Sequence, residues 1–193
     1  MLQVKRTNIF DLSRTFVALD IETTGFDAEK DQVIEIAAIK FDDNNVIDTF
    51  DTLIHPNRPV PPIIIHMTGI SDEMLEDAPQ FEEIKEKLVQ FIGNHPIVGH
   101  NISFDVGFLN QKGCALTNPL FDTLDLASML IPGLPSYSLD TLTRSLKIKH
   151  ENKHRALSDT KATHELFSIV LQKIKELDEH TLEGIKTILD KSS

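Results

Sequence analysis

The sequence has little cysteine, no long apolar run and a shortage of positive charge. Cys114 is the single cysteine among 193 residues, so an intrachain disulfide and a C-x-x-C zinc or redox site are excluded. We expect Cys114 to be a small buried hydrophobe. The longest apolar stretch, residues 60–65, is far below the roughly 20 residues of a membrane span. The first residues, MLQVKRTNIFDLSRTF, lack the apolar segment of a secretory signal. We therefore expect a soluble, cytoplasmic protein without a membrane partner.

The shortage of positive charge is large, with 19 Lys and Arg against 30 Asp and Glu and a net charge of −11. Such a balance argues against a protein that passively coats nucleic acid, which would need a basic excess. Surplus carboxylates can instead bind metal ions, and a metal site can hold phosphate. Charged residues make up 25% and hydrophobic residues 40% of the chain, which is typical of a globular domain.

The hydrophobic pattern indicates strands in the first part of the chain and helices in the second. We expect an arm over residues 1–14, one domain over 15–176 and a helical extension over 177–193. A loop is expected over 55–62, which holds four prolines. Strands are expected over 16–22, 33–41, 46–54, 96–99 and 120–121. Helices are expected over 71–92, from 103 with Ser103 as N-cap, and over 124–131, 138–146, 156–176 and 181–190. This order predicts an α/β fold with a mixed sheet.

Two acidic residues of the first strand share one face. Asp20 and Glu22 are two positions apart, so their side chains point the same way, about 6.5–7 Å apart along the strand. They share that face with Phe16 and Ala18, which suggests that it is covered. Two covered carboxylates would need a cation, although a solvated edge strand explains the pattern equally well.

Two further acids start helices. Asp105 lies four residues before Leu109, on the same side of its helix, but an acid in a first turn is also favoured by the helix dipole alone. Asp159 continues the apolar stripe of 166–174 backwards, so we expect it on the buried face. His154 lies 140° away from it on a helix and must belong to the preceding loop, where it could be a site residue or merely solvated.

Together these residues suggest a phosphodiester chemistry. Carboxylate oxygens favour Mg²⁺ or Mn²⁺, and two such ions can clamp the attacking and leaving oxygens of a phosphoryl displacement. A neutral histidine can take the proton of the attacking water. Whether these residues converge in space does not follow from their order in the chain.

Three segments carry a family resemblance. LDIETTG (19–25), VGHNISFDVGFL (98–109) and HRALSD (154–159) resemble the three motifs of the DEDDh 3′→5′ exonucleases, the DnaQ-like relatives of the DNA polymerase III proofreading subunit. The resemblance spans about residues 14–176. It implies a ribonuclease H-like mixed five-stranded sheet flanked by helices and two divalent ions. It also implies metal ligands at Asp20, Glu22, Asp105 and Asp159, with His154 as general base.

The resemblance also implies contacts with a single-stranded DNA 3′ end. Thr23, Thr24 and Gly25 match the place where the terminal 3′-hydroxyl is held, and His66 matches a loop near the terminal nucleotide. Asn101 and Phe104 flank the second motif, where a purely structural role is equally plausible. Asp122 is a fifth carboxylate, which we expect to cap the helix from 124.

Charge is unevenly distributed along the chain. Residues 144–161 carry a net charge of +4, and residues 27–51 carry −6. A basic rim beside acidic ligands would attract a phosphate backbone, although a solvated helix and loop would look the same.

Several alternatives stay open. The chain could trim RNA, or it could be a non-catalytic end-binding module of a polymerase or helicase assembly. A phosphatase of the aspartyl type would need a second Asp where Glu22 stands. The leading expectation is a metal-dependent 3′→5′ exonuclease that acts in proofreading or repair, with a polymerase or helicase subunit as a further partner.

Overall fold

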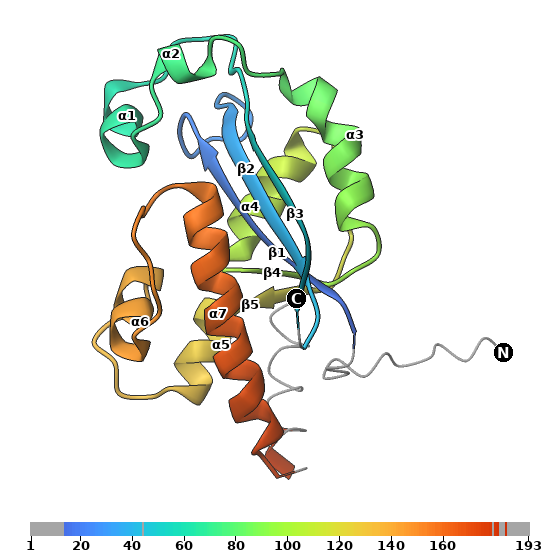
Figure 1. The fold of residues 1–193 in the computed structure, drawn as a ribbon, viewed down its shortest axis with the longest axis vertical. Helices are drawn as coiled ribbons and strands as arrows, with labels where there is room; N and C mark the ends of the chain where they lie inside the picture. The colour runs from blue at the N-terminus through green and yellow to red at the C-terminus, as the bar shows by residue number, and fades with distance from the viewer. Residues whose placement is uncertain (1–13, 44, 179, 182–183, 185–193) are drawn as a thin grey trace, which may run out of the picture.

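One mixed sheet of five strands forms the centre of the molecule (Figure 1). The computed structural model describes residues 14–43, 45–178, 180–181 and 184. The strand order is β3-β2-β1-β4-β5. The strands are β1 (Phe16–Thr23), β2 (Val33–Phe41), β3 (Val46–Leu53), β4 (Ile97–Gly99) and β5 (Leu120–Asp122). The first three are antiparallel neighbours, and β4 pairs in parallel with β1 and β5 with β4. The predicted α/β fold and mixed five-stranded sheet are confirmed.

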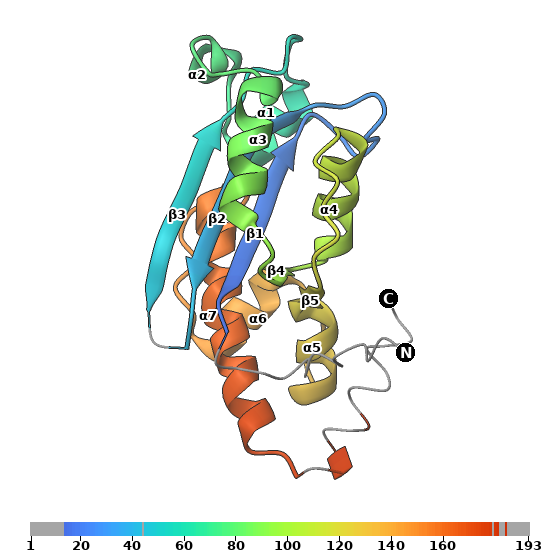
Figure 2. The same ribbon diagram turned by 90° about the vertical axis from the view of Figure 1, so that its right-hand side faces the viewer.

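Helices cover both faces of this sheet. On one face lie α5 (Thr123–Leu130), α6 (Leu139–Leu146) and α7 (Ala156–Lys175), and on the other lie α3 (Phe81–Ile92) and α4 (Ile102–Gln111) (Figure 2). Because successive side chains of a strand point to opposite faces, β1 contributes to both cores. Phe16 and Ala18 pack toward Phe167 of α7, whereas Val17 and Leu19 pack toward α3 and α4.

The coverage explains the composition of the strands. In β2, VIEIAAIKF, every residue except Lys40 is buried, as expected for a strand covered on both faces. β3 lies at the edge of the sheet, and its residues are mostly exposed. Helices on both faces of the sheet cover β1, including its carboxyl end with Asp20 and Glu22.

One expected helix was wrong in its bounds, and one helix had not been expected. The helix expected over 71–92 is interrupted, and forms α2 (Asp72–Leu75) and then α3. Pro79 lies in the break, where its missing N–H would have cost a helical hydrogen bond. The loop expected over 55–62 is confirmed up to residue 61, and the segment after it forms α1 (Pro62–Thr68), where no helix was expected. Pro62 stands in the first turn, where proline is tolerated, and Gly69 ends the helix with φ of 72°.

The remaining helix starts were mostly predicted well. Asp122 caps α5 by accepting the N–H of Leu124 at 2.9 Å, and Ser138 caps α6. The N-cap of α4 is Asn101 and not Ser103, so that expectation was wrong. Asp122 is the reason, because its carboxylate accepts the N–H groups of Asn101 and Ile102 and so satisfies the start of α4.

Some expectations fall outside the part of the chain that the structure describes. These are the arm over 1–14, apart from its last residue, and most of the helix over 181–190. The division at residue 176 stays a prediction. Within the described ranges, no helix combines the length and apolar character that crossing a membrane requires.

Candidate active site

The carboxyl end of β1 brings its two acids to the face that α7 covers. Asp20 and Glu22 follow Phe16 and Ala18 on that face, and both are partly buried. Glu22 is the cross-strand partner of Glu35 on β2, whose carboxylate reaches the start of α7. The covered face expected for these acids is therefore confirmed, and the solvated edge strand is excluded.

Asp105 joins them from α4 through the backbone of β1. Only Val17 and Ala18 of β1 pair with β4, so the strand is open toward α4 further along. There the Oδ1 atom of Asp105 accepts the N–H of Ile21 at 3.1 Å. Asp105 is only 6% exposed. Its position is thus set by a hydrogen bond from the peptide group that joins Asp20 to Ile21, which goes beyond a favourable interaction with the helix dipole.

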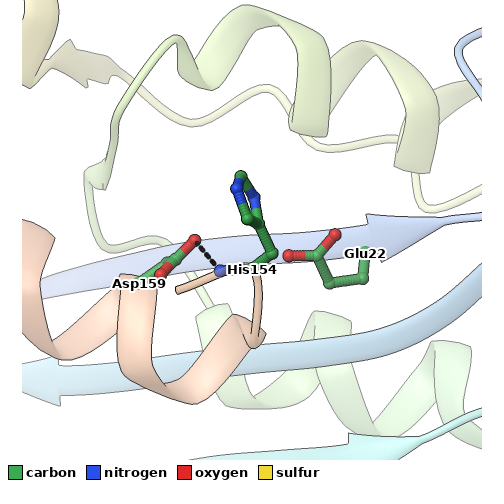
Figure 3. A group of neighbouring side chains, drawn as sticks. All are labelled: Glu22, His154 and Asp159. Atoms are coloured by element: carbon green, nitrogen blue, oxygen red, sulfur yellow. Dashed lines mark hydrogen bonds between the residues drawn. The ribbon is translucent and has the colours of Figure 1, made fainter. Parts of the chain in front are cut away.

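Asp159 and His154 complete the group from the first turn of α7 and the loop before it. The N–H of His154 donates to Oδ2 of Asp159 at 3.2 Å, and His154 has a positive φ of 59°. One ligand atom each of Glu22, His154 and Asp159 lies within 4.8 Å of the others (Figure 3). In that view the imidazole stands between the two carboxylates. His154 lies in the loop, as the helical geometry predicted.

The electrostatics show that these acids repel one another in the absence of a cation. Burial raises the pKa of Glu22 to about 8, and the charges of Asp159, Glu35 and Asp105 add to this. Burial raises the pKa of Asp105 to about 7, against the lowering effect of the Ile21 N–H. The pKa of Asp20 is raised by burial and then by Asp105 and Asp159. Buried carboxylates gathered in this way, with one imidazole beside them, are a donor set that fits a divalent cation.

A buried ion pair, which the sequence reasoning missed, holds the loop of His154 to the sheet. Glu35 is 2% exposed and accepts bonds from Nε and the terminal nitrogen of Arg155 at 3.1 and 2.7 Å, and from the N–H of Ala156 at 2.8 Å. A single acid inside the apolar run of β2 was the available signal, because carboxylates are rarely buried without a partner.

A second missed residue is His150. Its Nε2 atom lies 2.5 Å from Oδ1 of Asp159, and its side chain is only 5% exposed. The sequence offered only a lone histidine in a polar loop, where a solvated ring is the usual outcome. Both oxygens of Asp159 therefore have partners from the loop before α7.

The three residues after Glu22 are held by contacts within the turn that follows β1. Thr23 and Thr24 are buried, and their hydroxyls donate to Gly25 O at 2.6 Å and to Asp31 Oδ1 at 3.2 Å. A Cβ atom on Gly25 would lie 2.3 Å from the Asp31 carboxylate. The geometry thus gives these residues a part in closing the turn after β1, and a contact with substrate stays a prediction.

The other expected substrate residues are more open. His66 is exposed and lies on α1, not in a loop, at the same end of the molecule as the carboxyl end of β1 (Figure 1). Asn101 is exposed and adopts a left-handed conformation with φ of 64°. Phe104 is partly buried, with its ring 6.2 Å from that of Phe26, which is 81% exposed. The exposed Phe26 had not been singled out from the sequence.

Most basic side chains of residues 144–161 form ion pairs with acidic residues. Arg144 and Lys153 both contact Asp140, Lys149 pairs with Glu151 at 3.2 Å, and Arg155 pairs with Glu35. The local positive charge is therefore less available to a phosphate backbone than the sequence count suggests.

Comparison with known proteins gives the family to which this fold and its acidic group belong. Residues 17–167 match the family model described as exonuclease. The chain is 36% identical over 174 residues to the DNA polymerase III subunit epsilon of Aquifex aeolicus, covering 88% of this chain and 85% of that protein. The chain belongs to this exonuclease family, as its motifs predicted.

Other relatives are much longer than this chain. It is 38% identical over 182 residues to the PolC-type DNA polymerase III of Caldanaerobacter subterraneus subsp. tengcongensis, covering 92% of this chain and 13% of that protein. It is 35% identical over 179 residues to the 3′-5′ exonuclease DinG of Bacillus subtilis, covering 90% of this chain and 19% of that protein. The chain thus corresponds to a small part of these relatives.

Solved structures share the fold. Exonuclease X in complex with 5′ overhanging duplex DNA has a TM-score of 0.66 at 26% identity, covering 81% of this chain and 91% of that one. E. coli exonuclease I in complex with a dT13 oligonucleotide has a TM-score of 0.74 at 23% identity, covering 84% and 42%. The ribonuclease H-like fold expected from the motifs is confirmed.

Proposed function

We propose that this chain is a 3′→5′ exonuclease that hydrolyses the 3′-terminal phosphodiester of single-stranded DNA and releases nucleoside 5′-monophosphates. The observation that carries the proposal is the meeting of Glu22, Asp105 and Asp159 with His154, from three distant parts of the chain. The polarity is supported by the name of the DinG relative, and the single-stranded substrate by the oligonucleotide bound to exonuclease I.

The carboxylates would hold two divalent cations, Mg²⁺ or Mn²⁺. Asp20, Glu22, Asp105 and Asp159 supply hard oxygen ligands, which suit these ions. When bound, the ions would stabilise the negative charge that develops on the reacting phosphate. The high pKa values of Glu22 and Asp105 support this assignment, because a bound cation would favour the ionised form that burial disfavours.

His154 would act as the general base. Its ring is exposed on a loop beside Glu22 and Asp159, so it can reach both the solvent and the site. A neutral imidazole can accept the proton of the attacking water near neutral pH. The backbone bond from His154 to Asp159 keeps this ring next to the proposed ligands.

The 3′ end would lie between α4 and the turn after β1. Phe26 and Phe104 form an aromatic pair next to Gly25 and Asp105, and base stacking on such rings is tolerant of sequence. Thr23, Thr24, His66 and Asn101 are proposed to contact the terminal nucleotide.

The cellular role would be proofreading or repair, in association with a DNA polymerase or helicase subunit. This part of the proposal is supported by the epsilon and PolC-type relatives, which are DNA polymerase III proteins by name. A cytoplasmic location is part of the same proposal.

The test compares 5′-labelled single-stranded DNA, mismatched duplex and matched RNA in Mg²⁺ or Mn²⁺. The wild-type chain should release mononucleotides from the 3′ end of DNA. Asp20→Ala and Asp159→Ala should abolish this release, because each removes a proposed ligand. Asp48→Asn on the exposed strand β3 is a matched control that should retain full activity.

Three results would redirect the proposal. Full activity in both alanine variants would refute the site. A clear preference for RNA would identify a trimming exoribonuclease, and oligonucleotide binding without hydrolysis in Mn²⁺ would identify a non-catalytic end-binding module.

A further inference from the structure

His150 has a position that none of the proposed catalytic roles uses. It lies nine residues before Asp159 in the loop between α6 and α7, and its side chain is 5% exposed. Its Nε2 atom is 2.5 Å from Oδ1 of Asp159. The Asp159 side chain itself is 13% exposed, so the contact is shielded from solvent and belongs to the interior of the domain.

The chemistry of the two groups sets the direction of this bond. An ionised carboxylate can only accept hydrogen bonds, so the Nε2 atom of His150 must carry the hydrogen. On the other side of the ring, Nδ1 lies 3.5 Å from the hydroxyl of Thr143 on α6, a residue that is 1% exposed. The ring is thus held between α6 and the start of α7, with its donor directed at Asp159.

The bond also affects the loop that carries His154. The second oxygen of Asp159, Oδ2, accepts the backbone N–H of His154 at 3.2 Å. A carboxylate held at Oδ1 has a fixed side-chain rotation, and Oδ2 then has a fixed position as well. The geometry therefore links His150, Asp159 and the backbone of His154 in one hydrogen-bonded chain.

We propose that His150 is a positioning residue for the metal site, which orients the Asp159 carboxylate toward a bound cation. The inference rests on the proposed function, because it takes Asp159 to be a metal ligand. Hydrogen-bond partners behind metal ligands generally matter for affinity, and their loss costs about 10–100-fold in metal affinity or activity.

The first test measures Mn²⁺ binding by calorimetry, without any nucleic acid. His150→Leu removes the donor and keeps an apolar side chain of fair size, so the dissociation constant should rise about 10–100-fold. His150→Gln can still donate an N–H to Asp159 and should return binding to within a few-fold of wild type. His164→Leu is the matched control. The half-buried ring of His164 on α7 packs against Phe41 with centroids 4.4 Å apart, and the variant should bind Mn²⁺ as wild type.

The outcomes separate the two proposals. Wild-type Mn²⁺ affinity in His150→Leu, together with lost binding in Asp159→Ala, would overturn the role of His150 alone. Wild-type affinity in Asp159→Ala would overturn the metal site itself. Equal loss in the Leu and Gln variants would also overturn the positioning role, because it would show that the ring shape matters and the donated bond does not.

A second measurement on the wild-type chain does not depend on the variants folding. Histidine-selective ¹⁵N NMR should show a proton on Nε2 of His150, and Mg²⁺ should shift this signal. A bare Nε2, or a signal that does not respond to Mg²⁺, would overturn the proposal.

Discussion

His154 lies close enough to Glu22 and Asp159 to act in either of two ways. Its ring nitrogen could bind a cation together with the two carboxylates, or it could accept a proton from water while the carboxylates bind the cation. Its exposure and its place in a loop favour the second role, because a general base must accept a proton from the attacking water and pass it to the bulk solvent.

The variant His154→Ala distinguishes these roles. As a base, His154 should contribute about 10²–10⁴-fold to the rate, so turnover of a DNA oligonucleotide should fall by that factor while Mn²⁺ affinity stays near wild type. Single-turnover kinetics and calorimetry measure the two quantities separately. His164→Ala serves as control. A large loss of Mn²⁺ affinity would instead make His154 a ligand.

The position of a residue could be predicted where the periodicity of a helix or strand sets it. It could not be predicted where the path of a loop sets it. Asp159 was assigned to the buried face of its helix because Leu166, Phe167 and Val170 define an apolar stripe, and all three are fully buried. Glu22 followed from the alternation of β1. Neither argument applies to His150, whose partner is nine residues away and depends on the path of a loop. The hydrogen bond from the N–H of Ile21 to Asp105 likewise could not be predicted, because it depends on how short β4 is.

At the scale of elements, the start of α7 is fixed to the sheet by one ion pair. The carboxylate of Glu35 on β2 accepts hydrogen bonds from two nitrogens of Arg155 and from the N–H of Ala156. The Glu35 side chain is buried, whereas the Arg155 side chain is 36% exposed. The pair therefore sets where the loop of His154 ends and where the helix of Asp159 begins.

Loss of this pair should destabilise the domain. Breaking a buried pair costs about 3–5 kcal/mol, and the partial exposure of Arg155 reduces this, so Arg155→Ala should lower the free energy of unfolding by about 2 kcal/mol. Urea denaturation measures the change. Arg144→Ala, which breaks an exposed pair with Asp140, should cost less than about 1 kcal/mol. Equal losses in the two variants would contradict the role given to Glu35.

Elements were predicted best where the chain alternates regularly and worst near prolines. The strands β1 to β3 were expected within one residue of their observed bounds, because their sequences carry a regular strand pattern. The segment 55–80 was misjudged in two places. Helix α1, which starts at Pro62, was not expected, and Pro79, which separates α2 from α3, was placed inside a helix.

At the scale of the molecule, the surplus of acids behind the net charge of −11 includes the carboxyl groups gathered at the candidate site. Glu22, Asp105 and Asp20 all have raised pKa values because they are buried near one another. In the metal-free chain they hold protons at pH 5 to 7 that the unfolded chain has already released, because ordinary carboxyl pKa values lie near 4.

The stability of the metal-free chain should therefore fall as the pH rises. A raised folded-state pKa contributes stability that is complete at low pH, below the ordinary carboxyl pKa, and is lost as the pH passes about 7 for Asp105 and about 8 for Glu22. Urea denaturation in EDTA from pH 5.5 to 9 should show this decline, and Mn²⁺ should reduce it by binding the ionised carboxylates. A Glu22→Gln variant should show a shallower slope. Rising stability over this range would contradict the assignment.

The large sequence separation of its residues also makes the site a late product of folding. Ile21 and Asp105 are 84 residues apart in sequence, and Glu35 and Arg155 are 120 apart. Contacts of such separation form only after large loops close, so they are typical of a high contact order. A nascent chain that has not yet reached α7 has neither Asp159 nor His154 beside β1. During synthesis, the full group of Glu22, Asp105, His154 and Asp159 therefore assembles only once α7 has docked on the sheet.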